Sequence, residues 1–248
     1  MPVIAWVVIF SLAGSLGVVL GAGILLLAGE GRRRLLPFLI SFAVGTLLGA
    51  AFLGMLPRAL EGGNHREVLA AALFGLVLFF LLEKWVLWRH CHQADCDLHS
   101  SAGPLILAGD AFHNFVDGFA IAAAFLISIP LGVSTSLAVI AHEIPQELGD
   151  FAILLESGYA RKWAFVLNLA SSATTLPGAI MAYYALSSVA SIIPYVLAVS
   201  AASFIYIAVA DLIPSLHRRT TIRLGLEQLI LMLTGIGAIW LVKFLSGR

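Results

Sequence analysis

The sequence predicts an all-α integral membrane protein, and two observations support this fold class. Of the 248 residues, 60% are hydrophobic and only 11% are charged, with a mean hydropathy of +1.00, whereas a soluble domain has about 25% charged residues. Apolar runs of about 20 residues, enough to cross a bilayer as a helix, recur along the whole chain. We therefore expect one transmembrane domain over 1–248, with no separate soluble domain.

The apolar runs predict eight multi-pass membrane spans. Their approximate ranges, in order, are 3–28, 35–60, 68–88, 104–129, 133–157, 163–187, 191–214 and 224–246. The first run lacks the basic start and the small-residue cleavage site of a signal peptide, so we interpret it as a helix.

The basic residues predict the orientation. The odd-numbered loops and their edges carry Arg32, Arg33, Arg34, Lys84, Arg89, Arg161, Lys162, Arg218, Arg219 and Arg223. The opposite side has only Arg58, Arg66, Lys243 and Arg248. By the positive-inside rule, the odd loops are cytoplasmic and both termini lie outside. The net charge of zero argues against a nucleic-acid partner. The apolar spans make the lipid bilayer the expected surroundings of the chain.

The third loop, 89–103, is a candidate metal-binding segment. It reads "RHCHQADCDLHS" from residue 89 and contains His90, Cys91, His92, Cys96 and His99. On this topology the loop faces a reducing cytoplasm, so we expect thiol ligands rather than a disulfide. The alternative is a polar loop that carries these residues without a metal.

Ionisable residues also cluster within the fourth and fifth spans, where such groups usually mark function. In the fourth span, at about 100° per residue, Asp117, Asp110 and Asn114 lie within about 100° of His113. In the fifth span, Gln146, Asp150, Glu143 and Glu147 lie at about 40°, 80°, 100° and 140° from His142. Each span therefore carries a single polar stripe.

The two stripes are expected to meet. His113 and His142 each lie about 15 Å from the start of their span, near the middle of a core about 30 Å thick. The short link "SIPLG" makes the spans antiparallel neighbours. Pro145 frees a backbone carbonyl beside His142, which either shapes packing or kinks the helix at an ion site, as in transporters.

The ligand types indicate a divalent transition metal. Imidazole, carboxylate and carboxamide groups without cysteine or methionine suit zinc or iron(II) better than copper(I), calcium or magnesium. Protons compete for the same lone pairs, so metal binding is expected to depend on pH.

Two segments resemble a known family. "HNFVDGFAIAAAF", followed by "HEIPQELGDFAILL", is similar to the fourth- and fifth-helix signature of the ZIP (Zrt/Irt-like) metal-ion transporters, closest to the branch that reads HExPHExGD. The resemblance implies carriage of zinc, and also of iron, manganese or cadmium, towards the cytoplasm by alternating access. It further implies inverted three-helix repeats around helices 4 and 5 (3+2+3) and a homodimer.

The resemblance also implies a set of ligands. His113, Asp117, His142 and Gln146 would form the main site, and Asn114 and Glu143 would share Asp117 and Gln146 in a second one. Glu147 is either a ligand or a support, and Asp110 and Asp150 are pathway or supporting residues. The chain departs from the family at Gln146, which is histidine in most of that branch, and has no carboxylate in its sixth span.

Two other functions remain open. An intramembrane zinc protease would use His142 as ligand and Glu143 as base, but Gln146 stands where the second histidine belongs. A pore or metal sensor would share the same ligands without a carrier cycle. We expect a transporter and not an enzyme, in a bacterial plasma membrane.

Overall fold

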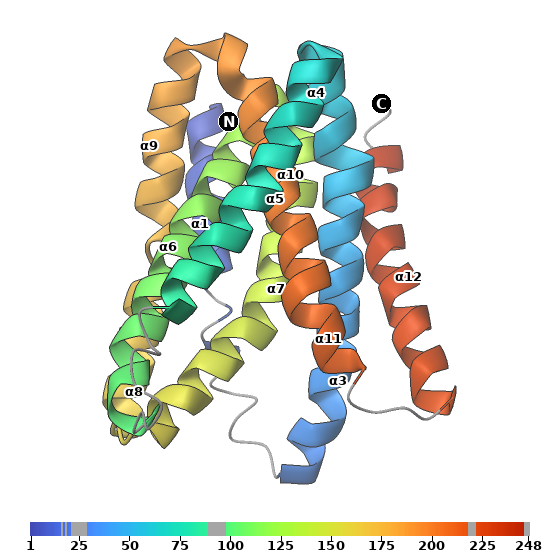
Figure 1. The fold of residues 1–248 in the computed structure, drawn as a ribbon. Helices are drawn as coiled ribbons and strands as arrows, with labels where there is room; N and C mark the ends of the chain where they lie inside the picture. Colours follow the sequence, from blue (N-terminus) through green and yellow to red (C-terminus); the bar gives the residue numbers. More distant parts are fainter. Residues whose placement is uncertain (16, 18, 21–28, 89–97, 218–221, 246–248) are drawn as a thin grey trace.

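The computed structural model describes residues 1–15, 17, 19–20, 29–88, 98–217 and 222–245. Within these ranges every regular element is helical, which confirms the predicted all-α bundle. Figure 1 shows the helices side by side, with both chain ends at the same end of the bundle.

The helices follow one another in a simple order. They are α1 (Val3–Gly14), α3 (Gly29–Gly49), α4 (Leu56–Gly62), α5 (His65–Trp88), α6 (Leu98–Ile127), α7 (Ile129–Glu156), α8 (Arg161–Ser172), α9 (Thr175–Ser188), α10 (Ile193–Tyr206), α11 (Ile213–Leu216) and α12 (Ile222–Leu245). Two π-helical segments, η1 (Ala50–Met55) and η3 (Ile207–Leu212), and one 3₁₀ turn, η2 (Ala190–Ile192), connect some of them directly. With elements that follow without a loop joined, and with α8 and α9 counted together as one interrupted rod, the described ranges form eight rods.

Six of these rods are long and apolar enough to cross a membrane. The fifth rod in chain order, α7, is also long enough at 28 residues but carries the acidic stripe. The first rod begins with α1, and residues 16, 18 and 21–28 of the predicted span 3–28 lie outside the described residues. The helices α5 and α12 are only 11% buried in their apolar windows. They pack on α10 and α3, respectively, and expose their other faces, as lipid-facing helices do.

The fourth and fifth spans form a tight pair. A single residue, Ser128, separates α6 from α7, and its side chain caps α7 by accepting a hydrogen bond from the Leu131 nitrogen at 3.3 Å. Pro130 stands in the first turn, where a missing N–H leaves no bond unmade. Because α6 begins at Leu98, residues 98–103 of the loop predicted over 89–103 are helical, and 89–97 lie outside the described residues.

The sixth span is broken. The sequence predicts one helix over 163–187, but α8 ends at Ser172 and α9 begins at Thr175. A side-chain hydroxyl interacts with backbone carbonyls there: the single O–H of Thr174 is shared between the Ser171 carbonyl at 2.7 Å and the Ala111 carbonyl of α6 at 2.6 Å. Such local bonds weaken a helix, and here they tie the break to α6.

The packing has the internal symmetry of the expected inverted repeats. The second rod contacts the eighth through α3 and α12, and the third contacts the seventh through α5 and α10. Exchanging the first three rods with the last three turns one pair into the other. The second and seventh rods run in opposite directions in Figure 1, and each has a π-helical segment shortly before a proline, Pro57 or Pro214.

Candidate metal centre

The α6 side of the centre is held close to α9. Gly118 and Gly178 lie at the crossing of these helices, where a Cβ on Gly118 would approach the Ala179 nitrogen to 2.5 Å. Small residues allow membrane helices to approach this closely. The crossing places His113 and Asp117, one helical turn apart, against α7.

The α7 side presents His142 in a defined orientation. Its Nδ1 lies 3.0 Å from the Ala138 carbonyl, and Phe204 packs on the ring at 6.0 Å between centroids. A carbonyl can only accept, so Nδ1 carries the proton and the Nε2 of the neutral ring presents a lone pair towards His113. Metal-binding histidines are commonly oriented by such a bond.

Four side chains converge between α6 and α7. The Nε2 of His113 lies 3.1 Å from His142 Nε2 and 3.6 Å from both Asp117 Oδ2 and Glu143 Oε1. The Nε2 of His142 lies 3.2 Å from Asp117 Oδ2 and 3.5 Å from Glu143 Oε1. Four ligands about 2.0–2.1 Å from a tetrahedral zinc ion are about 3.3–3.4 Å apart. The spacing therefore suits one ion of zinc size.

A second group of carboxylates adjoins the first. Oxygens of Asp110, Glu143 and Glu147 lie within 4.8 Å of one another, so Glu143 belongs to both groups. Asp110 is the best-connected of the three: Oδ1 accepts from the amides of Asn114 at 3.0 Å and Gln146 at 3.1 Å, and Oδ2 accepts from the Ser171 hydroxyl.

The other carboxylates in the two groups have no such donors. In the described part of the chain, neither oxygen of Asp117, Glu143 or Glu147 accepts a hydrogen bond, and all three residues are 0% exposed. Burying carboxylates without partners is strongly unfavourable. A bound cation would supply the missing partner, which is the strongest physical indication of a metal centre here.

The predicted site residues occupy different places in this arrangement. His113, Asp117, His142 and Glu143 form the first group, whereas the amides of Asn114 and Gln146 turn to Asp110. Asp150 is half-buried and stands in neither group. Among the candidate loop ligands, His90, Cys91, His92 and Cys96 lie outside the described residues, and only the helical backbone of His99 is described.

Sequence reasoning missed the contribution of the sixth span. Asn168 donates to the Glu147 carbonyl at 3.1 Å, and Thr175 donates to Asn114 Oδ1 at 3.0 Å. Together with Ser171, these residues surround the second group from α8 and α9. The run "NLASSATTLP" of residues 168–177 is unusually polar for a membrane span, and it could have indicated that this span contacts the centre.

Comparison with known proteins adds an independent finding. Residues 89–243 match a family model described as ZIP zinc transporter. Zinc transporter ZIP13 of Danio rerio is 30% identical over 264 residues, covering 83% of this chain and 75% of the relative. Zinc transporter ZIP13 of Pongo abelii is 35% identical over 213 residues, covering 80% of this chain and 64% of the relative.

A third relative, zinc transporter ZIP10 of Danio rerio, is 38% identical over 145 residues and is covered over 17% of its length. The chain therefore spans less than two thirds of two of these three relatives. The relatives compared are named as transporters, not as enzymes, and come from animals, so they do not support the expected bacterial plasma membrane.

Proposed function

The chain belongs to the ZIP zinc transporter family, and from this premise we propose that it transports a divalent transition metal, with zinc as the best-suited cargo. The observation that carries the proposal is the group His113, Asp117, His142 and Glu143, whose spacing suits a tetrahedral ion. Two imidazoles and two carboxylates also accept iron(II), manganese(II) and cadmium(II), so these ions are expected competitors.

In this proposal Glu143 belongs to both binding positions. The metal binds first between the two histidines, then passes to the group of Asp110, Glu143 and Glu147. Polar side chains of α8 and α9 adjoin the second group, and they support passage of the metal in this direction. Movement towards the cytoplasm by alternating access, in a homodimer, is the expectation that follows from the family.

Discontinuous helices beside the ligands support a carrier. The break between α8 and α9 lies against α6, through Thr174, next to the second group. Transporters commonly form their ion sites from broken helices near the membrane midplane. A zinc protease has less support, because Gln146 donates to Asp110 rather than providing a histidine nitrogen.

The test is zinc uptake into proteoliposomes. We expect the double variant His142→Ala, Asp117→Ala to lose saturable uptake, because it removes two of four ligands. The matched control is His65→Ala, since His65 is exposed at the start of α5, and it should transport as the parent does. Unchanged uptake by the double variant contradicts the proposed site, and linear, electrogenic flux in the parent indicates a channel.

A further inference from the structure

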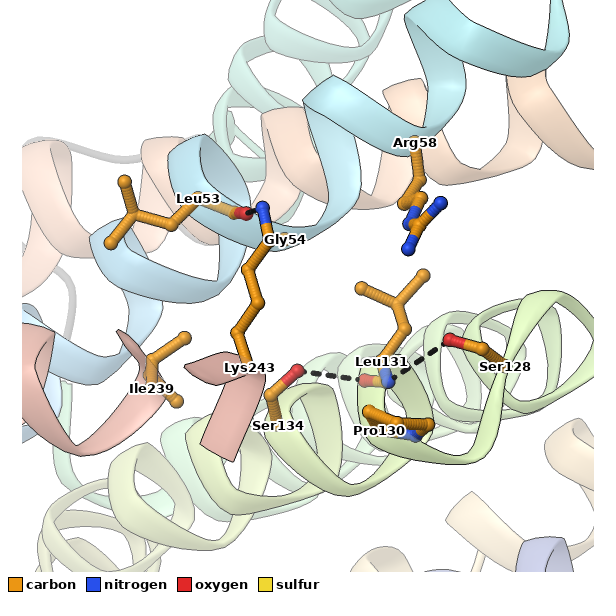
Figure 2. Close-up of a pocket in the computed structure, with 9 residues that line it drawn as sticks. All are labelled: Leu53, Gly54, Arg58, Ser128, Pro130, Leu131, Ser134, Ile239 and Lys243. Atoms are coloured by element: carbon orange, nitrogen blue, oxygen red, sulfur yellow. Dashed lines mark hydrogen bonds between the residues drawn. The ribbon is translucent and has the colours of Figure 1, made fainter. Parts of the chain in front are cut away.

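A cavity away from the metal centre lies at the end of the bundle where the chain ends lie. Its volume is about 270 Å³, and it opens between the segment from η1 to α4, the start of α7 and the end of α12. Figure 2 shows its lining side chains, with the Lys243 chain extending across it and the Arg58 guanidinium directed towards Leu131. None of the metal-centre residues lines it.

The cavity is electropositive on its polar side. Lys243 Nζ donates one hydrogen bond, to the Leu53 carbonyl at 2.8 Å, and an ammonium has two further N–H groups. Arg58 pairs with Glu61 at 2.8 Å, but the Glu61 side chain is 64% exposed, so this bond is readily exchanged. No acidic residue is among those that line the cavity in the described part of the chain.

The start of α7 adds a favourable field. Ser128 and Pro130, at the first turn of this 28-residue helix, both line the cavity. The positive end of the helix dipole therefore faces the same space as the two cations, and this arrangement attracts an anion and repels a divalent metal.

The remaining wall is apolar. Leu53, Leu131 and Ile239 line the cavity beside the two cations. The volume is close to the lower end of small-ligand pockets, about 300 Å³, which accommodates a phosphate and a glycerol backbone. A free phosphate makes no favourable contact with the apolar wall, whereas a lipid can pack its first methylene groups against it. Basic pockets between membrane helices on the cytoplasmic or matrix side bind lipid headgroups in this way, and this cavity presents the same combination of cations and apolar wall at the end of the bundle where the chain ends lie.

From these features we infer that the cavity binds an anionic phospholipid, with its phosphodiester between Arg58 and Lys243 and its first acyl carbons against Leu53, Leu131 and Ile239. The lipid would bridge α4, α7 and α12, so it would join the helix that carries His142 and Glu143 to the rods around it. The inference does not depend on the proposed transport function, because binding is measured without metal.

The test is native mass spectrometry of the full chain after exchange into vesicles or micelles containing phosphatidylglycerol and phosphatidylcholine at equal amounts. We expect retention of phosphatidylglycerol by the parent. The variant Arg58→Gln, Lys243→Gln should retain about 25-fold less, at about five-fold for each cation. The matched control is Arg66→Gln, which removes an exposed cation at the same end of the bundle and should leave retention unchanged.

A charge-preserving variant separates binding from folding. Arg58→Lys, Lys243→Arg should restore retention to within about three-fold of the parent, since phosphate contacts of this kind depend mainly on charge. Equal retention of the two lipids by the parent, or an unchanged phosphatidylglycerol level in the double glutamine variant, overturns the inference. So does displacement of the lipid by inorganic phosphate at millimolar concentration, because that result assigns the cavity to a free anion.

Discussion

Replacing Glu143 with glutamine tests which side chain completes the metal centre. The substitution keeps the length of the side chain and removes one negative charge beside the two imidazoles, 3.5 Å and 3.6 Å away. Glu143 is 0% exposed, so the interaction that it would make with an ion is fully desolvated. Removing one partner of a buried charge pair costs about 3–5 kcal/mol, and a tenfold change in affinity corresponds to about 1.4 kcal/mol.

We therefore expect Glu143→Gln to weaken zinc binding by at least about 100-fold. The comparison variant is Gln146→Ala, which removes one hydrogen bond, to Asp110 at 3.1 Å. A single hydrogen bond contributes about 0.5–1.5 kcal/mol. This one is made to Asp110, which does not belong to the group around the two histidines, so zinc affinity should fall by about tenfold or less.

The assay is competition with a chromophoric zinc chelator in detergent, at one pH for all variants. The reasoning fails if Gln146→Ala weakens zinc binding more than Glu143→Gln does. That outcome makes Gln146 the fourth ligand, as the family resemblance implies. Thermal unfolding of each metal-free variant serves as the control for folding.

Two further predictions concern packing and protons. Gly118→Ala should destabilise the metal-free protein by about 1–3 kcal/mol through overpacking, and so lower its thermal midpoint, since the new Cβ meets the Ala179 nitrogen at 2.5 Å. The control is Gly149→Ala, where the new Cβ has nothing within 4 Å. Equal midpoints for the two variants contradict the close crossing. Zinc affinity should fall as the pH is lowered, because protons compete with the metal for the imidazole and carboxylate lone pairs; an affinity that does not change with pH argues against these ligands.

The sequence predicted the elements of the centre because helical periodicity is local. His113 and Asp117 stand four residues apart, so any α-helix puts them on one face. The nearly direct connection at Ser128 then makes α6 and α7 antiparallel neighbours. Together these two facts bring the two stripes to neighbouring helices at the same depth, and the packing of the other helices then decides which faces meet.

The partner of His142 within α7 could not be predicted in the same way. Relative to His142, Gln146 lies at about 40° and Glu143 at about 100°, so the helical wheel favours Gln146. The structure turns Glu143 towards the imidazoles instead, because rotation of a helix about its axis depends on its neighbours. Near Glu143 the chain approaches closely, and a Cβ on Gly17 would lie 3.2 Å from the Glu143 Cβ.

The sixth span was missed for a different physical reason. Serine and threonine in membrane helices usually bond to carbonyls three or four residues earlier, as Ser171 does with Asn168 at 3.1 Å. Such residues do not disturb the apolar pattern enough to mark a site. Their role at Asp110 and Asn114 depends on the close crossing of α6 and α9, which involves distant parts of the chain.

The two π-helical segments, Ala50–Met55 and Ile207–Leu212, have a consequence for how this chain can change in length. A π-helical turn contains one residue more than an α-helical turn. Deleting one residue from an ordinary membrane helix rotates everything beyond it by about 100°. Deleting one residue inside either segment instead converts it to α-helix and keeps the faces before and after it aligned. In the described part of the chain, a one-residue deletion within either segment should therefore leave the packed faces beyond Pro57 or Pro214 directed away from lipid.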